Sequence, residues 1–451
     1  MTMTISRRRF LQLSASFGLL AGLGKLDLAR AAAQDYKALV CLFMLGGNDG
    51  HNLLVSRDST QYAAYQNARG SLALPSGQLV DILDPTLGAM GLHYGLQDLQ
   101  PLFTQGKLAI LANVGVLVQP TRYNNLSNSN FPLPINLRSH SDQVGLMQTG
   151  IPNAVGSSGW GGRTLDQLTS YNSGSSFPVS IAMNSPAIFC IGGVTQGVSL
   201  QPGNYLDQSG LNAWPAAAAQ AKALAQQQII SADSGNYIVN AANRVMTSAT
   251  SLNPLLRAAS TGVQFSSDFG SSQIGTQLKE IARIISLNSQ LNVGRQVFFC
   301  SLGGFDTHSG QSWQQWNLLQ QVGKALAGFH STMTSWGCAN QVTTFTLSDF
   351  GRTLQPSGTG SDHGWGSHHL VLGGAVNGGK IYGRFPLMTN YKNFNTFADD
   401  YADTRGTMLP STALVQYGAT LAKWFGASDA QLNSIFPALA NFTTRDLGFM
   451  A

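Results

Sequence analysis

Aspartates and histidines gather in four short, widely separated segments of this 451-residue sequence. Three of the segments directly follow apolar runs, and the fourth follows a glycine-rich loop. The candidate metal ligands in them are Asp49, Asp306, His308, Asp349, Asp362 and His363. Mixed carboxylate and imidazole ligands suit zinc, manganese or iron better than calcium, which prefers oxygen alone. The set therefore predicts a centre for one or two divalent metal ions; the alternative at each single position is a turn aspartate or a surface histidine.

Continuous apolar runs precede the polar segments and predict the strands that position them. The runs are Lys37–Leu45, Lys107–Val116, Phe177–Met183, Gln296–Leu302 and Gln341–Leu347. Such runs, bounded by turn residues, are typical of strands buried on both faces of a parallel sheet. Helical periodicity separates them, for example over Gln277–Ser289 and Trp313–Thr332. The alternation predicts an α/β fold, a three-layer sandwich around a mostly parallel central sheet.

The carboxyl ends of these strands are the expected place for a site, because ligands of open α/β sheets bind beyond that edge. We expect residues 34–451 to form a single domain. A cap or insertion is expected around residues 184–275, where an Ala/Gln-rich helix is predicted at Ala216–Gln228.

The first 33 residues have the features of an export signal. Three arginines precede Phe10 and Leu11, an apolar run follows over Leu13–Leu23, and small residues occupy Ala31–Ala33. This order resembles a twin-arginine signal with cleavage after Ala33, which predicts contact with the twin-arginine export machinery and a periplasmic or extracellular mature protein. A basic N-terminal helix or an uncut signal anchor is the alternative. No later segment is long and apolar enough to predict a membrane span.

The charge of the chain is concentrated in this leader. The formal net charge is +5, from 26 basic and 21 acidic residues. Residues 1–33 hold five bases and one acid, a net of +4, which leaves 21 bases and 20 acids, or +1, for the rest. A nearly neutral mature chain carries no basic stripe, so we do not expect nucleic-acid binding.

The order of the polar segments resembles the alkaline phosphatase superfamily, which includes the sulfatases. Specifically, the chain resembles the exported bacterial family catalogued as domain of unknown function 1501. In sulfatases the first strand ends in acidic metal ligands, as at Asn48 and Asp49 here, and a later strand ends in another ligand pair, as at Asp306 and His308. The resemblance spans Tyr36 to about Pro386. It implies an alkaline-phosphatase-like fold.

Two further segments carry the resemblance, and one of them departs from the pattern. A Ser-Asp-His-Gly segment of sulfatases is matched by residues 348–351, and a glycine-rich turn with a histidine is matched by residues 362–366. Phe350 stands where the sulfatase pattern has a histidine, which removes one metal ligand. Asp362 together with His363 is the expected compensation.

The resemblance also implies a nucleophile near the start of a helix. Superfamily members carry a Ser, Thr or modified Cys there, about ten residues before a Thr-Gly or similar pair. Counting back from Thr149-Gly150 reaches His140, and a shift of one residue gives Ser139 as the candidate attacking hydroxyl. His140 is alternatively a metal ligand or a general acid, and Ser139 or Ser141 is alternatively only the helix N-cap.

Two functions from different classes follow from these observations. The first is an exported metal-dependent hydrolase of a small or polymer-attached phosphate or sulfate ester, in which Arg138 or Arg352 clamps the oxyanion unless it pairs with a nearby aspartate. The second is a non-catalytic binding or assembly module for envelope polymers that keeps the superfamily fold. A Rossmann oxidoreductase is disfavoured, because the glycines at residues 46–50 lack the G-x-G-x-x-G spacing.

Overall fold

The computed structural model describes residues 35–175, 177–203, 214–236, 262–392 and 399–451, together with several residues between 239 and 257. The predicted twin-arginine leader, residues 1–33, lies outside the described residues. Among the residues that are described, none of the helices combines the length and apolar character that crossing a membrane requires.

A nine-stranded sheet forms the centre of the molecule, with strand order β11-β5-β10-β9-β1-β8-β6-β7 and with β12 paired to β5. The strands are β1 Lys37–Met44, β5 Leu108–Gly115, β6 Ser180–Met183, β7 Val198–Leu200, β8 Arg295–Leu302, β9 Val342–Ser348, β10 Ser367–Gly373, β11 Lys380–Tyr382 and β12 Thr412–Ala413. Strand β1 pairs in parallel with β8 on one side and β9 on the other, and Met44 lies level with Leu302 and with Ser348. The polar segments after these three strands therefore begin at one level of one sheet edge.

Strand β10 runs against the direction of the sheet. It pairs antiparallel with β9 and with β5, so β5 and β9 point the same way. The segment between β9 and β10 consequently returns to the edge at which the other strands end. Residues that precede β10 in the sequence thus join residues that follow β1, β8 and β9.

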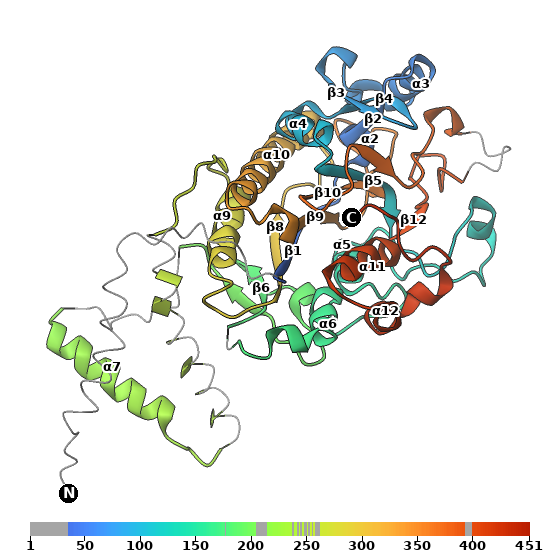
Figure 1. The fold of residues 1–451 in the computed structure, drawn as a ribbon. Coiled ribbons are helices and arrows are strands. Elements are labelled where there is room, and N and C mark those ends of the chain that lie inside the picture. Colours follow the sequence, from blue (N-terminus) through green and yellow to red (C-terminus); the bar gives the residue numbers. More distant parts are fainter. Residues whose placement is uncertain are drawn as a thin grey trace, which may run out of the picture.

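Helices cover both faces of the sheet (Figure 1). Helices α9 (Gln273–Ser286) and α10 (Gln311–Ser335) pack on one face. The other face carries α5 His140–Thr149, α6 Trp160–Asp166, α11 Leu414–Phe425 and α12 Asp429–Ile435. Alternate side chains of β1 enter the two cores: Val40 and Leu42 join the core under α9 and α10, and Cys41 joins the other. Burial of each such side chain contributes about 1.5–3 kcal/mol.

A group of smaller elements follows β1 in the sequence. Helix α2 (Gly50–Leu53) follows β1 directly. The other elements of this region are β2 Leu54–Ser56, β3 Val80–Asp84, β4 Gly88–Leu92, α3 Ser59–Arg69 and α4 Gln100–Thr104. The three strands form a separate antiparallel sheet in the order β2-β4-β3.

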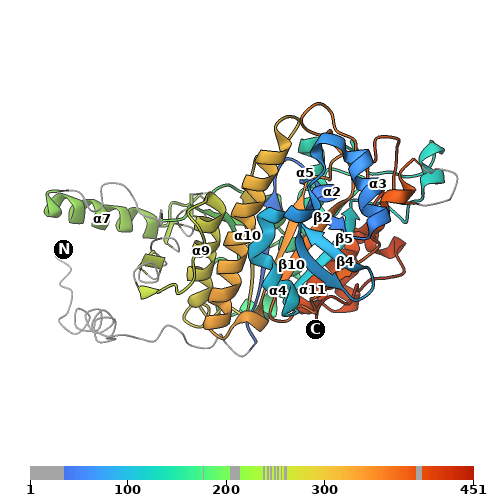
Figure 2. The same cartoon turned by 90° about the horizontal axis from the view of Figure 1, so that it is seen from above.

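The predicted α/β sandwich with its mostly parallel sheet is confirmed. The sequence did not predict β10, because its histidines interrupt the apolar pattern, nor the small antiparallel sheet. The cap around residues 184–275 stays a prediction. Its one long described helix, α7 (Ala216–Ser231), buries only Ala219 and stands apart from the sheet in both views (Figures 1 and 2).

Candidate metal centre

The ends of β1, β8 and β9 approach each other closely at Gly46. Its φ is +116°, and a Cβ there would lie 2.3 Å from the backbone nitrogen of Asp306. A side chain at this position would therefore push the segment after β8 away from the end of β1. The Gly46 N–H also donates to Asp349 Oδ1 at 3.0 Å. One glycine thus joins the three strand ends that carry the candidate residues.

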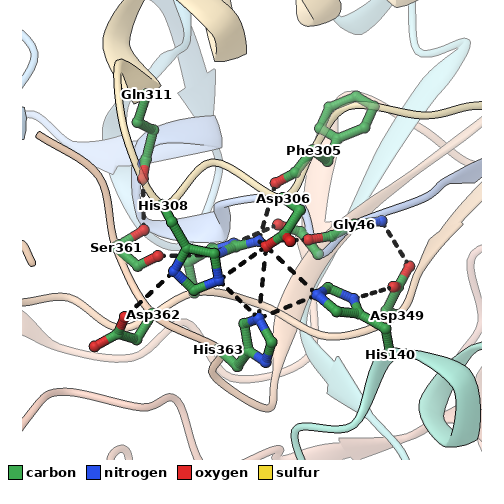
Figure 3. A network of polar contacts seen from close by, with 12 residues as sticks. Gly46, His140, Phe305, Asp306, His308, Gln311, Asp349, Ser361, Asp362 and His363 are labelled. Carbon is green, nitrogen blue, oxygen red and sulfur yellow. Dashed lines mark hydrogen bonds and ion pairs between the residues drawn. The ribbon is translucent and has the colours of Figure 1, made fainter.

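Three imidazole rings and one carboxylate converge at this edge (Figure 3). The Nε2 atom of His363 lies 3.0 Å from Nε2 of His140 and 2.9 Å from Nε2 of His308. Asp306 Oδ1 lies 3.4, 3.1 and 3.5 Å from the Nε2 atoms of His140, His308 and His363, respectively. We call these four residues the ligand cluster.

The outward nitrogen of each ring faces a hydrogen-bond acceptor. His140 Nδ1 lies 2.7 Å from Asp349 Oδ2, and His363 Nδ1 lies 2.7 Å from the backbone oxygen of Arg138. His308 Nδ1 lies 3.4 Å from Asp362 Oδ1. A neutral ring that donates from Nδ1 presents a lone pair at Nε2. The three Nε2 lone pairs therefore point at one another and at an acidic oxygen.

This donor set fits a divalent cation. Four electron-pair donors facing one point repel each other unless a positive charge lies between them. Zinc binds imidazole nitrogen at about 2.0–2.1 Å, so ligand atoms of a tetrahedral site lie about 3.3 Å apart. Asp306 Oδ1 and His363 Nε2 each lie 2.9–3.5 Å from the other three ligand atoms of the cluster. Acceptors on the outward ring nitrogens are the usual partners of metal-binding histidines.

Burial and charge adjust the acidity of two cluster residues. Partial burial acts to raise the pKa of Asp306, but the hydrogen bond and positive charge of Arg352 outweigh it and lower that pKa below its ordinary value. Burial lowers the pKa of His363, and the nearby His140 and Arg352 lower it further. At neutral pH the carboxylate is thus ionised and the His363 ring is neutral, as metal ligation requires.

Arg352 links the strand ends beside the ligand cluster through hydrogen bonds. Its guanidinium is fully buried and donates to the backbone oxygens of Gly47 at 3.0 Å, Ser361 at 2.8 Å and Gly46 at 2.6 Å. It also donates to the carboxylate of Asp306. Because these partners use its donors, the arrangement favours a positioning role for Arg352 over the predicted clamp on a substrate oxyanion.

Asp49, predicted as a metal ligand, is placed in another environment. Its carboxylate forms an ion pair with the buried Arg69 and accepts hydrogen bonds from Gln311 Nε2 at 2.5 Å and from the His51 backbone N–H at 3.0 Å. Among the described residues, no contact joins Asp49 to the ligand cluster. The structure therefore brings together Asp306, His308 and His363 of the predicted set and leaves Asp49 apart.

Asp349 and Asp362, also predicted as ligands, lie one layer further out. Asp349 is buried and contacts the His140 ring, as described above. Asp362 accepts from Arg405 Nη1 at 2.6 Å and faces the His308 ring. Their contacts orient the rings, which is the usual role of carboxylates behind metal-binding histidines. The Phe350 ring packs against two rings of the ligand cluster, with its centre 4.8 Å from that of His140 and 4.7 Å from that of His363.

The predicted nucleophile lies beside the cluster at the start of α5. Ser139 is the N-cap residue, and His140 is the first residue of the helix. Ser139 Oγ donates to Asp142 Oδ2 at 2.5 Å and lies 3.3 Å from Ser141 Oγ. Of the alternatives for His140, the geometry favours metal ligand. The role of Ser139 as attacking hydroxyl stays a prediction.

Two charged residues at the rim were not among the sequence predictions. Asp403 pairs with Arg138 Nη2 at 2.5 Å, so Arg138 takes the aspartate-paired alternative, and Arg405 pairs with Asp362. The signal available in the sequence was local charge density: residues 399–405 hold four charged side chains in a chain that is only 10% charged. No strand run precedes this segment, so a site at strand ends does not predict it.

The family of the chain is established by a sequence-family model. The model described as "Protein of unknown function (DUF1501)" matches residues 36–399. The chain belongs to the DUF1501 family. The match includes every residue of the ligand cluster and both aspartates behind it. A search of curated proteins finds no match.

Solved structures with a similar arrangement share little sequence with this DUF1501 protein. Ps i-CgsB in complex with k-i-k-neocarrahexaose is 10% identical with a TM-score of 0.34, over 90% of this chain and 77% of that one. The C-terminal periplasmic domain of EcEptC from Escherichia coli in complex with zinc is 10% identical with a TM-score of 0.34, over 88% and 84%. A 2-O GAG sulfatase is 9% identical with a TM-score of 0.31, over 89% and 74%.

Proposed function

We propose that this DUF1501 protein is an exported, metal-dependent hydrolase that acts on a phosphate or sulfate ester. The observation that carries the proposal is the ligand cluster, in which three imidazole lone pairs and the Asp306 carboxylate face one point. The side chains of Asp306 and His308 are each 46% exposed, so the point that they face is open to solvent on one side. A catalytic zinc ion can accept a fifth ligand in the transition state, and an ester oxygen would reach the ion from this exposed side.

The ligand cluster would hold one divalent ion, and zinc, manganese and iron are the candidates. A divalent metal supplies polarisation of an ester oxygen and activation of a nucleophile near neutral pH. The chain contributes the fixed geometry. Asp349, Asp362 and the Arg138 carbonyl hold the three rings, and Arg352 holds the loop of Asp306, so little reorganisation is needed when an ester binds.

Ser139 is the proposed attacking hydroxyl. Its Oγ–H already donates to the Asp142 carboxylate, which is placed to take the proton when Oγ attacks phosphorus or sulfur. The position at the first turn of α5 also favours a negatively charged ester, because free backbone N–H groups point out of a helix N-terminus. Arg138 pairs with Asp403 through Nη2 alone, and the other donors of its half-exposed guanidinium are the proposed partners of the ester's oxyanion.

The proposed compartment is the periplasm or the cell exterior, reached through the twin-arginine machinery. The support is the leader sequence, residues 1–33, with its arginines, apolar run and small-residue site. Substrates of such a protein are esters outside the cytoplasm, either small molecules or groups attached to a polymer.

Metal content and ester turnover test the proposal together. The exported protein is purified, its metal is measured by ICP-MS, and p-nitrophenyl phosphate and p-nitrophenyl sulfate are offered with zinc, manganese or iron. We expect about one metal per chain and turnover of one ester, both lost in Asp306→Ala and kept in Asp81→Ala, which removes an exposed aspartate elsewhere. A wild-type protein that binds none of these metals overturns the proposal and favours the non-catalytic envelope module.

A further inference from the structure

We propose that a groove beside the metal centre, lined by Arg122 and Arg384, binds an anionic saccharide unit of the substrate. The inference rests on the proposed function and extends it, because it assigns the esters to a class of polymer. The groove encloses about 580 Å³, within the range of sites that hold small ligands.

The groove lies at the same sheet edge as the ligand cluster. Strand β5 points the same way as β9, so the segment after its last residue, Gly115, leaves the sheet at the catalytic edge. That segment lines the groove from Leu117 to Arg122. Only β10 separates β5 from β9, and two strand spacings amount to about 10 Å. The groove therefore begins at the sheet edge two strands from Asp349, which lies behind the His140 ring.

Two direct connections support this placement. Trp365, two residues after His363, donates from Nε1 to the backbone oxygen of Val116 at 2.9 Å. On the other side, the segment from Asp399 to Asp403 runs from the groove to the rim of the metal centre. Four residues of chain span at most about 14 Å. A polymer that lies across this rim would touch both places.

The guanidinium groups in the groove have N–H groups that are available to a ligand. Arg384 contacts the backbone oxygen of Asp399 and, at 3.3 Å, the carboxylate of Asp400, in both cases through Nη2. Among the described residues its Nε and Nη1 have no partner. The Arg122 side chain is 81% exposed, and its nearest acidic oxygen, on Asp399, is 4.0 Å away.

Unused guanidinium donors in the groove favour an anion. Of the described residues in its lining, Asp399 alone is acidic, and its Oδ1 accepts the backbone N–H of Tyr123 at 2.9 Å. With Asp400 beside Arg384, two carboxylates balance the two guanidinium groups, so it is their unpaired N–H groups that would bind an anionic group. Guanidinium binds carboxylate, sulfate and phosphate through paired, parallel hydrogen bonds.

The rest of the lining indicates a sugar rather than a bare ion. Phe131, Phe442, Pro120 and Pro410 supply apolar surface. Hydroxyl and amide groups alternate with it, on Thr121, Asn125, Ser411, Gln416 and Thr443. A pyranose ring offers apolar faces and a rim of hydroxyls, which this mixture matches, and its carboxylate, sulfate or phosphate would lie against the two arginines.

Calorimetric binding tests the inference without requiring turnover. The full mature protein is titrated with a heparin-derived tetrasaccharide, with neutral maltotetraose and with inorganic sulfate. The variants are Arg122→Ala/Arg384→Ala and, as a control that removes the same charge elsewhere, Arg57→Ala/Lys423→Ala. Loss of one charged hydrogen-bond pair corresponds to at least about tenfold in Kd.

We expect the tetrasaccharide to bind more tightly than either probe and the Arg122/Arg384 variant to raise its Kd at least tenfold, with the control variant within twofold of wild type. Equal binding of sulfate and tetrasaccharide, or equal loss in both variants, overturns the inference. Turnover of p-nitrophenyl esters by the same samples reports separately on the proposed function. Binding through both arginines without turnover refutes the hydrolase alone, and turnover without tetrasaccharide binding refutes the groove alone.

Discussion

Two sets of three histidines lie near the strand ends of this protein and have opposite surroundings. His140, His308 and His363 are partly exposed, and their Nε2 atoms meet beside Asp306. The second set is fully buried and consists of His51, His368 and His369. In the sequence the two sets look alike, because both stand next to glycine-rich turns and strand ends.

The partner of each ring distinguishes the two sets. In the ligand cluster every Nδ1 faces an acceptor, which turns the Nε2 lone pair towards the common point. In the buried set His51 contacts the backbone oxygen of Gly406 through Nε2, and His368 Nδ1 accepts the backbone N–H of Asn113, both at 3.0 Å. His51 and His368 are therefore each fixed to the backbone, and His369 stacks against Tyr417. The two sets thus differ in the group that each ring faces.

The largest expected effect comes from replacing one histidine of each set with alanine. His363→Ala removes one of four ligands, so we expect loss of bound metal and a fall in ester turnover of at least about 100-fold, with little change in stability. His369→Ala empties a buried site against Tyr417, so we expect a loss of about 2–4 kcal/mol in the free energy of unfolding with metal content retained.

Metal analysis and urea denaturation of the same two variants measure this contrast. His363 is only partly buried, which is why its removal leaves the core intact. Retention of full metal occupancy in His363→Ala would break the comparison, and so would loss of metal from a folded His369→Ala protein.

A serine pair at the start of α5 sharpens the assignment of the nucleophile. Ser139→Ala removes the hydroxyl that donates to Asp142, whereas Ser141→Ala removes the exposed hydroxyl of the serine two residues later. We expect kcat to fall at least about 1000-fold in the first variant and less than twofold in the second, with metal content unchanged in both. Wild-type kcat in a metal-loaded Ser139→Ala protein would show that the hydroxyl does not attack.

The carboxylate behind His140 gives a smaller effect. Asp349→Asn keeps an oxygen for the Gly46 N–H but removes the negative charge that holds the His140 ring. We expect metal affinity to fall about 10–100-fold, as for other partners behind metal-binding histidines. Competition with a chelator measures the affinity. Unchanged affinity would mean that the His140 ring needs no carboxylate behind it.

The sequence predicted the sheet well and the site in part, for a physical reason. Strand β1 is buried on both faces, and all its residues after Lys37 are apolar, so its pattern is clear. Strand β10 is equally buried, but it carries His368, which accepts a backbone hydrogen bond, and His369, which stacks against Tyr417, and no sequence pattern reveals these partners.

The sequence could not predict which aspartate belongs to the ligand cluster. Asp49, Asp306 and Asp349 all follow strands, and only three-dimensional contacts separate Asp306 from the other two. Asp49 faces Arg69, which comes from α3 and is 20 residues away in the sequence. Asp349 turns towards Gly46 and His140. The direction of a side chain after a strand end depends on partners that long-range folding brings in, and local spacing does not encode them.

The smallest expected effect of a substitution is a one-proton change in the pH dependence of stability, and it belongs to the buried set. Burial lowers the pKa of His51 to about 4 and that of His368 and His369 to about 3, from an ordinary value near 6.5. Below pH 6.5 the unfolded chain takes up protons that the folded chain does not, so the stabilising contribution is complete above pH 6.5 and declines as the pH falls towards 4 and 3. Each ring contributes up to about 1.4 kcal/mol per pH unit within that window.

Urea denaturation of the chelator-treated protein at pH 7, 6 and 5 measures the slope of the free energy of unfolding against pH. His369→Phe keeps an aromatic ring but cannot take up a proton, so it should reduce this slope by the contribution of one proton. A slope that is identical in wild type and His369→Phe would show that this ring takes up its proton in the folded state too, and the contrast between the two sets of histidines would then rest on ring orientation alone.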